Sequence, residues 1–236
     1  MTRALHSADH DPELPVVAQP SEQQDLPAGR FSSWLRHTQS VLKTRSGAEV
    51  PCGECNACCR SSYFIHIDPD ETETIARIPS QLLFPAPGHP DGRLVMGHDQ
   101  RGHCPMLVDD ACSIYEHRPV VCRNYDCRVF AAAGIAAGDE DKELVSRRAR
   151  RWRFGYSAER DRLLHSAVQA AVRFLPEHSA GLGERAPSTS TQLAVLAIKV
   201  CDVFLEIHDE HHKAGSTPTA VDIVDAVIEA NDTYDD

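Results

Sequence analysis

Cysteine spacing constrains this chain more than any other feature of its sequence. Eight of the nine cysteines in the 236 residues follow the pattern C-x2-C-x2-C-C and, after a gap of 44 residues, C-x7-C-x9-C-x4-C. Thiolates are soft ligands that suit zinc, copper(I) and iron–sulfur clusters, and short spacings let one loop supply several of them. We therefore predict metal binding by the thiols of Cys52, Cys55, Cys58, Cys59, Cys104, Cys112, Cys122 and Cys127.

The adjacent pair Cys58 and Cys59 interrupts the rhythm of the opening loop. Neighbouring Cα atoms are about 3.8 Å apart, which is shorter than a disulfide normally spans. Adjacent side chains also diverge, on a strand as on a helix. We therefore expect one of these sulfurs to join Cys52 and Cys55, and the other to meet the second half of the pattern. Eight thiols suit two four-thiolate sites, or one such site with spare thiols.

The second half of the pattern also contains specific residues between its cysteines, in CPML and in CSIYEHRPVVCRNYDC. With the opening CGECNACC, this order resembles the CxxCxxCC cysteine-cluster family (YkgJ-type proteins, described as zinc- or iron-chelating). The resemblance covers roughly residues 50–135 and implies a metal-binding domain. Some relatives are regarded as iron–sulfur proteins, among them a flagellin lysine methylase with a similar opening motif. The matching positions of the second half are Cys104, Pro105, Leu107, Cys112, Ile114, Tyr115, Arg118, Pro119, Cys122, Arg123, Tyr125 and Cys127.

Two kinds of metal centre fit this pattern. Zinc would stabilise a loop-rich region that has a thin core. An iron–sulfur cluster would serve electron transfer, and C-x2-C-x2-C resembles part of a ferredoxin run, although the next cysteine follows at once and the proline is absent. The family descriptions favour the cluster. We predict an iron–sulfur protein with a redox or enzyme-associated role. The alternatives are a zinc-stapled protein-interaction module and a methylase-like protein-modifying enzyme, and no catalytic residue is assigned.

Arg118 and Arg123 lie between the last cysteines and are predicted to contact the cofactor. A tetrathiolate site around a divalent ion carries net negative charge, which nearby guanidinium groups offset. The alternative is a salt bridge to Asp109, Asp110 or Asp126, because arginine pairs readily with carboxylates.

The overall composition limits the partners and the compartment. The formal net charge is −11, which disfavours general attraction to nucleic acid or to an anionic membrane. No stretch approaches the roughly 20 apolar residues of a membrane span, and the N-terminus has no signal-peptide core. We therefore expect a cytoplasmic protein, where cysteine clusters bind metals more often than they form disulfides. A protein partner would bind the helical C-terminal region. The arginine-rich stretch 147–153 is expected to be the solvated face of a helix.

The expected fold is α+β: a small, loop-rich, metal-organised cysteine domain with short strands, followed by a mainly α-helical part. The divisions are a disordered tail (1–27), a helix (28–50) that packs over the next domain, the metal-binding domain (51–135) and a helical region (136–236).

Local patterns place the elements within these divisions. We expect strands at 63–67 and 93–97, and a helix from Asp68-Pro69 to Arg77. A loop should occupy 81–92, and a hairpin should turn at Asp109-Asp110. Three apolar stripes predict helices near 163–175, 193–207 and 221–228, with Cys201 in the core.

Overall fold

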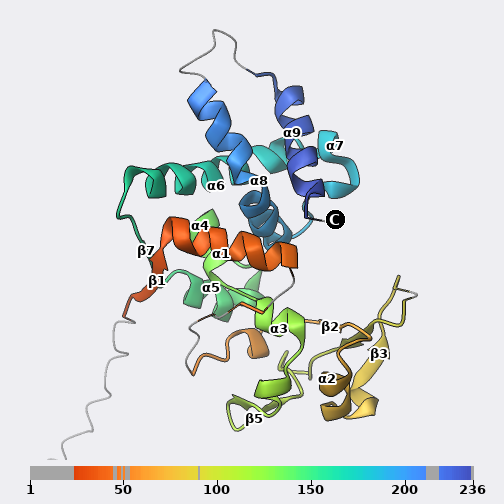
Figure 1. Cartoon of the computed structure of the whole chain (residues 1–236). Coiled ribbons are helices and arrows are strands. Elements are labelled where there is room, and N and C mark those ends of the chain that lie inside the picture. The colour runs from red at the N-terminus through yellow and green to blue at the C-terminus, as the bar shows by residue number, and fades with distance from the viewer. Residues whose placement is uncertain are drawn as a thin grey trace, which may run out of the picture.

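The computed structural model describes residues 24–44, 47–48, 50, 54–89, 91–210 and 218–234, without the side chains of 206–210. Cys52 lies outside the described residues, and so does most of the segment predicted as a tail. The structure is mixed helix and strand with a helical C-terminal part, as predicted. The helices of the C-terminal part gather in the upper part of Figure 1, and the cysteine region with its short strands lies below them.

The helical part is built from both ends of the chain. The two longest helices, α6 and α8, pack along each other, and α1 and α9 pack against α8 (Figure 1). Their buried faces are mainly apolar, as the stripes predicted, but Val221 is exposed and Val227 is buried in its place. The helices are α1 (Phe31–Thr44), α4 (Arg128–Ala133), α5 (Glu143–Ala149), α6 (Glu159–Glu177), α7 (Ser179–Leu182), α8 (Ser190–Glu210) and α9 (Ala220–Asp232).

No single helix in the described part of the chain is long and apolar enough to cross a membrane. The pair Ser179–Arg185 and Ser190–Leu205, which is bent by 96°, meets that length and composition test only when both members are taken together. Within the bundle, α8 buries Cys201 completely, so the prediction that the ninth cysteine is a core residue is confirmed.

An N-terminal strand joins the helical part through a pairing that the sequence did not predict. Strand β1 (Leu26–Arg30) pairs in parallel with β7 (Trp152–Gly155). Helix α1 follows directly and buries Phe31 and Trp34 against the C-terminal helices, whereas we expected it to pack over the cysteine region. The larger apolar surface lies on those helices, which explains the difference.

One buried carboxylate fixes the junction between β1 and α1. Asp161 on α6 accepts hydrogen bonds from the backbone N–H of Ser32 at 3.1 Å, from the Arg30 side chain at 3.1 Å and from the backbone N–H of Ala158 at 2.9 Å. These bonds, led by those from Ser32, hold the pKa of Asp161 well below its usual range. The charged form is therefore the one that stabilises the fold.

The cysteine region has a small three-stranded antiparallel sheet of order β2-β4-β3. Strands β2 (Ile65–Ile67) and β4 (Leu94–Met96) confirm two predictions. Strand β3 (Leu83–Pro85) lies where we predicted a loop. That prediction was wrong because a proline is tolerated on an edge strand, and β3 is an edge.

Helix α2 (Thr72–Arg77) ends where predicted but begins later than the Asp68-Pro69 pair suggested. The reason is the side chain of Glu71, which precedes the helix. Its carboxylate accepts the backbone N–H of Asp68 at 3.0 Å and that of Val120 at 2.7 Å. The first bond holds Asp68 in the turn before the helix, and the second ties that turn to the start of α3 (Val120–Asn124).

The predicted hairpin is present. Strands β5 (Leu107–Val108) and β6 (Ala111–Cys112) pair in antiparallel register. Asp109 and Asp110 form the turn with φ of 49° and 62°, which is the left-handed pair that a two-residue hairpin requires and that aspartate tolerates. A second small core lies under the sheet and the hairpin, formed by Ile67, Ile78, Met96, Met106 and Ile114. Organisation of this region by metal stays a prediction.

The arginine-rich stretch 147–153 is divided between two elements. Helix α5 ends within it, and its last residues begin β7. Glu143 pairs with two of its arginines, at 3.8 and 2.7 Å, as expected of a solvated helix. Trp152, however, is buried in the strand, so the prediction of one charged helix face was wrong for this residue.

Candidate metal centre

Six of the predicted thiols line one cavity of about 690 Å³. Its walls come from the opening loop, the β5–β6 hairpin and α3, which are far apart in the sequence. Apolar side chains, including Met96, Met106 and Ile114, cover the side that faces the small core. The six cysteines are Cys55, Cys58, Cys59, Cys104, Cys112 and Cys122.

Hydrogen bonds fasten the opening loop to the second half of the pattern. The carbonyl of Cys59 accepts the backbone N–H of Cys104 at 2.7 Å. Asn56 donates its side-chain N–H to the carbonyl of Asp110 at 3.0 Å, and Arg60 forms an ion pair with the carboxylate of the same residue. This backbone bond brings Cys59 next to Cys104, while the expectation that its sulfur shares a metal site with the later cysteines stays a prediction.

Four thiols form a first electrostatic group. Burial, and then three neighbouring sulfurs, raise the pKa of Cys122 to about 12. Burial, with the sulfur of Cys112 among the lesser causes, also raises the pKa of Cys104. Thiolates that share a cavity repel one another, so the raised pKa values of Cys104 and Cys122 favour their neutral forms. The three sulfurs that act on Cys122 are those of Cys104, Cys59 and Cys112.

Cys58 and Cys127 lie beside a pair of tyrosines, which line the same cavity as Cys58. The hydroxyls of Tyr63 and Tyr125 are 2.6 Å apart and hydrogen-bonded. Burial is the main cause that raises the pKa of both tyrosines, that of Tyr63 to about 12, and the sulfurs of Cys58 and Cys127 contribute to both shifts. Cys58 packs against the large helical core, of which Cys127 is a member. The two adjacent cysteines both line the cavity, but Cys59 raises the pKa of Cys122, whereas Cys58 raises the pKa of the two tyrosines.

Cys127 is buried where the cysteine region meets the helices. Its Sγ accepts the indole N–H of Trp152 at 3.2 Å. Next to it, the buried carboxylate of Asp126 pairs with Arg128 at 2.8 Å and accepts the indole N–H of Trp34 at 2.9 Å. Helix α4 is thus fixed to α1 and to β7 at the residue that ends the cysteine pattern.

The predicted arginines both lie in the cavity wall. Arg118 stacks on Tyr115, 3.9 Å from the ring centroid, and donates to its carbonyl at 2.9 Å. Arg123 has a buried Nε without a hydrogen-bond partner in the described part of the chain. Of the carboxylates considered as alternative partners, Asp110 pairs with Arg60 and Asp126 with Arg128. Among the described residues, no ion pair joins either cavity arginine to a carboxylate.

The thiols are not gathered around one point. Within the described ranges, no three histidine, cysteine, aspartate or glutamate side chains are close enough together to hold a metal ion. Cys52 is outside those ranges. The donor set nevertheless fits a soft metal, because several thiols from three segments face a shared cavity whose wall also contains two guanidinium groups, and neither forms an ion pair with a carboxylate of the described residues.

Sequence reasoning missed several residues of the site. Trp152 and Lys142 both lie beyond the cysteine motif. The ammonium group of Lys142 lies 4.4 Å from the ring centroid of Tyr63 and donates to the carbonyl of Ser61 at 2.5 Å. These contacts join distant segments, so no local pattern indicates them. Gly102 is similar: its φ is +78°, and a Cβ there would collide with the side chain of Ser62.

Comparisons with known proteins agree with the site. No curated protein and no solved structure matches this chain. The sequence profile of the CxxCxxCC family, described as a "Putative zinc- or iron-chelating domain", matches residues 51–145. That match includes all eight clustered cysteines, the β5–β6 hairpin and both arginines of the cavity wall. The resemblance seen in the sequence is confirmed, because the profile of the CxxCxxCC family matches residues 51–145 of this chain.

Proposed function

We propose that this protein binds metal through its clustered cysteines and that Cys59, Cys104, Cys112 and Cys122 form one four-thiolate site. The observation that carries this proposal is their placement on a shared cavity wall. The opening loop, the hairpin and α3 each contribute, and the bond between the Cys59 carbonyl and the Cys104 N–H holds two of these segments together. Four sulfur donors are the usual set for zinc and for iron–sulfur clusters.

Binding requires the four side chains to rotate toward a common point and to lose their protons. Burial opposes that ionisation, as the raised pKa of Cys122 shows, so a bound cation must supply the compensating charge. A tetrathiolate site around a divalent ion keeps a net charge of about −2. Arg118 and Arg123 lie in the same wall and offset it.

We infer that the bound group is an iron–sulfur cluster rather than a single zinc ion. Structural zinc sites are closed by their four ligands, whereas this cavity measures about 690 Å³ and has further thiols in its wall. An iron–sulfur cluster supplies one-electron transfer when bound. The buried and partly buried sulfurs and the two arginines would set its potential, because burial, charge and hydrogen bonding are the terms that control it.

Metal analysis of the full chain, purified without oxygen, tests the proposal. We expect brown protein containing iron and acid-labile sulfide. Cys112→Ser should lower the content of iron and sulfide per chain. Cys201→Ser should leave that content unchanged, because Cys201 is buried on α8 away from the cavity. Colourless protein with stoichiometric zinc would overturn the inference of an iron–sulfur cluster but not the proposal that the cysteines bind metal. Protein that binds neither metal would overturn both.

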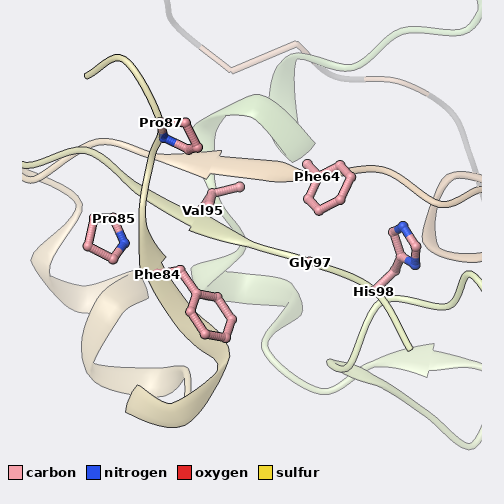
Figure 2. Close-up of a pocket in the computed structure, with 7 residues that line it drawn as sticks. All are labelled: Phe64, Phe84, Pro85, Pro87, Val95, Gly97 and His98. Atoms are coloured by element: carbon pink, nitrogen blue, oxygen red, sulfur yellow. The ribbon is translucent and has the colours of Figure 1, made fainter. Parts of the chain in front are cut away.

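A zinc-stapled interaction module is the second candidate, and two observations favour it. The core under the cysteine region consists of only five buried apolar residues, so metal would add much to its stability. Exposed rings also gather on the sheet: Phe64 is 65% and Phe84 is 56% exposed. Figure 2 shows both rings beside Val95 and Gly97, lining a groove of about 410 Å³. A methylase activity rests on the family resemblance alone.

Chelation separates these two candidates. For a zinc staple, removing the metal should unfold residues 51–135 while the helices keep most of their circular dichroism, because the helical core is separate from the small one. Loss of an electron-transfer activity with the fold intact would instead support the iron–sulfur protein.

A further inference from the structure

Trp152, the first residue of β7, donates its indole N–H to a cysteine sulfur. Its indole N–H points at the Sγ of Cys127 at a distance of 3.2 Å, and both side chains are buried. Indole is a donor only, and a neutral thiol is a weak acceptor. A thiolate is a much better one, because hydrogen bonds to a charged group are roughly twice as strong as neutral ones. The arrangement suits a sulfur that carries charge.

The position of the indole is set by groups outside the cysteine motif. Trp152 opens β7 and pairs with Leu26 of β1, so its backbone is held by the sheet. Two guanidinium groups approach its ring, that of Arg148 at 5.1 Å and that of Arg128 at 5.8 Å from the centroid. The helical part of the chain, beyond residues 51–145, therefore aims a fixed N–H donor at a cysteine of the matched domain.

Cys127 shares part of its surroundings with one thiol of the opening loop, Cys58. Cys58 and Cys127 both lie beside the hydrogen-bonded pair Tyr63 and Tyr125, and both contact the large core. Cys55 precedes Cys58 by three residues and lies in the same cavity wall. Cys55, Cys58 and Cys127 are therefore the described thiols of the cysteine pattern that do not belong to the proposed four-thiolate site.

We propose that Cys58 and Cys127 belong to a second metal site and that Trp152 is its positioning residue, donating its indole N–H to the sulfur of Cys127. This proposal rests on the proposed function, since it requires that the clustered thiols bind metal. The N–H fixes the direction of the sulfur and stabilises its ionised form. A site of this kind takes a thiophilic cation or cluster, and its wall comes partly from the helical region.

Titration of the full chain with Co²⁺ under anaerobic conditions tests the assignment, because cobalt thiolates absorb in the visible and near ultraviolet. We expect two binding phases. Cys127→Ser should remove one and Cys112→Ser the other. Trp152→Phe keeps an aromatic ring but loses the N–H, and it should weaken the phase that depends on Cys127 by roughly 10- to 100-fold. At saturation it should also shift the thiolate-to-cobalt absorption of that phase.

Trp34→Phe is the matched control. It removes a buried indole N–H from the same core, but that N–H donates to Asp126 instead of a sulfur. Both cobalt phases should therefore be unchanged. If Trp152→Phe leaves both phases intact, or if Trp34→Phe has the same effect, the assignment is overturned. If Trp152→Phe is too unstable to titrate, Cys127→Ser decides: a full second phase without this thiol would overturn the second site. Wild-type protein that contains neither iron nor zinc as purified, and that also binds no cobalt, would overturn the proposed function itself.

Discussion

Replacing Asp126 with asparagine removes the charge from the most deeply buried ion pair of the described structure without changing the side-chain shape. Asp126 and Arg128 are 3% and 9% exposed, and their closest N···O distance is 2.8 Å. The carboxylate also accepts the indole N–H of Trp34 from α1. In Asp126→Asn the guanidinium group would stay buried without its counter-charge. Breaking one partner of a buried pair costs about 3–5 kcal/mol.

Chemical denaturation followed by circular dichroism measures this loss of unfolding free energy. In a thermal melt, the same loss should lower the melting temperature by about 6–20 °C, at about 2–4 °C per kcal/mol for a chain of this size. Arg185 and Asp232 form the matched control, a two-bond pair that is 47% and 45% exposed. Asp232→Asn should cost no more than about 1 kcal/mol.

A double substitution checks the physical reason. Adding Arg128→Met to Asp126→Asn removes the unpaired cation, so part of the lost stability should return. If Asp126→Asn costs less than about 1 kcal/mol, or if the double variant is less stable than the single one, the pair does not hold α4 to α1 as described. Either result would refute the reasoning.

Three further predictions follow from single contacts. Asp161 has a depressed pKa, so it stabilises the fold at neutral pH, and this contribution is lost as the pH falls below about 4; Asp161→Asn should lower stability at pH 7 and flatten its decline between pH 5 and 3. Gly88→Ala, which has open space around it, should lower the unfolding free energy by only the roughly 1–2 kcal/mol of a strained left-handed residue. Gly102→Ala should lower it by more, because the added Cβ would also collide with Ser62, and denaturation midpoints measure both losses. Glu71→Ala removes the acceptor for the N–H of Val120 and should destabilise the cysteine region by about 1.5–3 kcal/mol, measured by hydrogen exchange in α3.

Local chemistry explains which elements could be predicted from the sequence. Asp109-Asp110 indicated the hairpin because the turn type depends on those two residues alone. The apolar stripes indicated α6 and α8 because helical periodicity is a property of one segment. Strand β1 could not be predicted in this way, since its partner β7 lies more than a hundred residues later. Asp161 and Trp152 act through the same kind of distant contact.

The candidate site also has features that local sequence predicts and features that depend on distant contacts. The spacing of the cysteines indicated the donor atoms, and the divergence of Cys58 from Cys59 followed from backbone geometry. The companions of each sulfur could not be read from the sequence, because they depend on which core each one approaches. The structure brings Cys59 to the hairpin and Cys58 to the helical core. The position of Cys52, outside the described residues, stays a prediction.

The adjacent cysteines connect two parts of the protein that have separate cores. Cys104 and Cys112 pack against the small core, whereas Cys58 and Cys127 belong with the large one. If each group binds metal, the shortest covalent connection between the two centres is the peptide link from Cys58 to Cys59, whose Cα atoms are about 3.8 Å apart. Ordering one sulfur then restricts the backbone that carries the other. Loading of the first site should therefore tighten the second, and a Gly insertion between the two cysteines should abolish that coupling while leaving eight thiols in the chain.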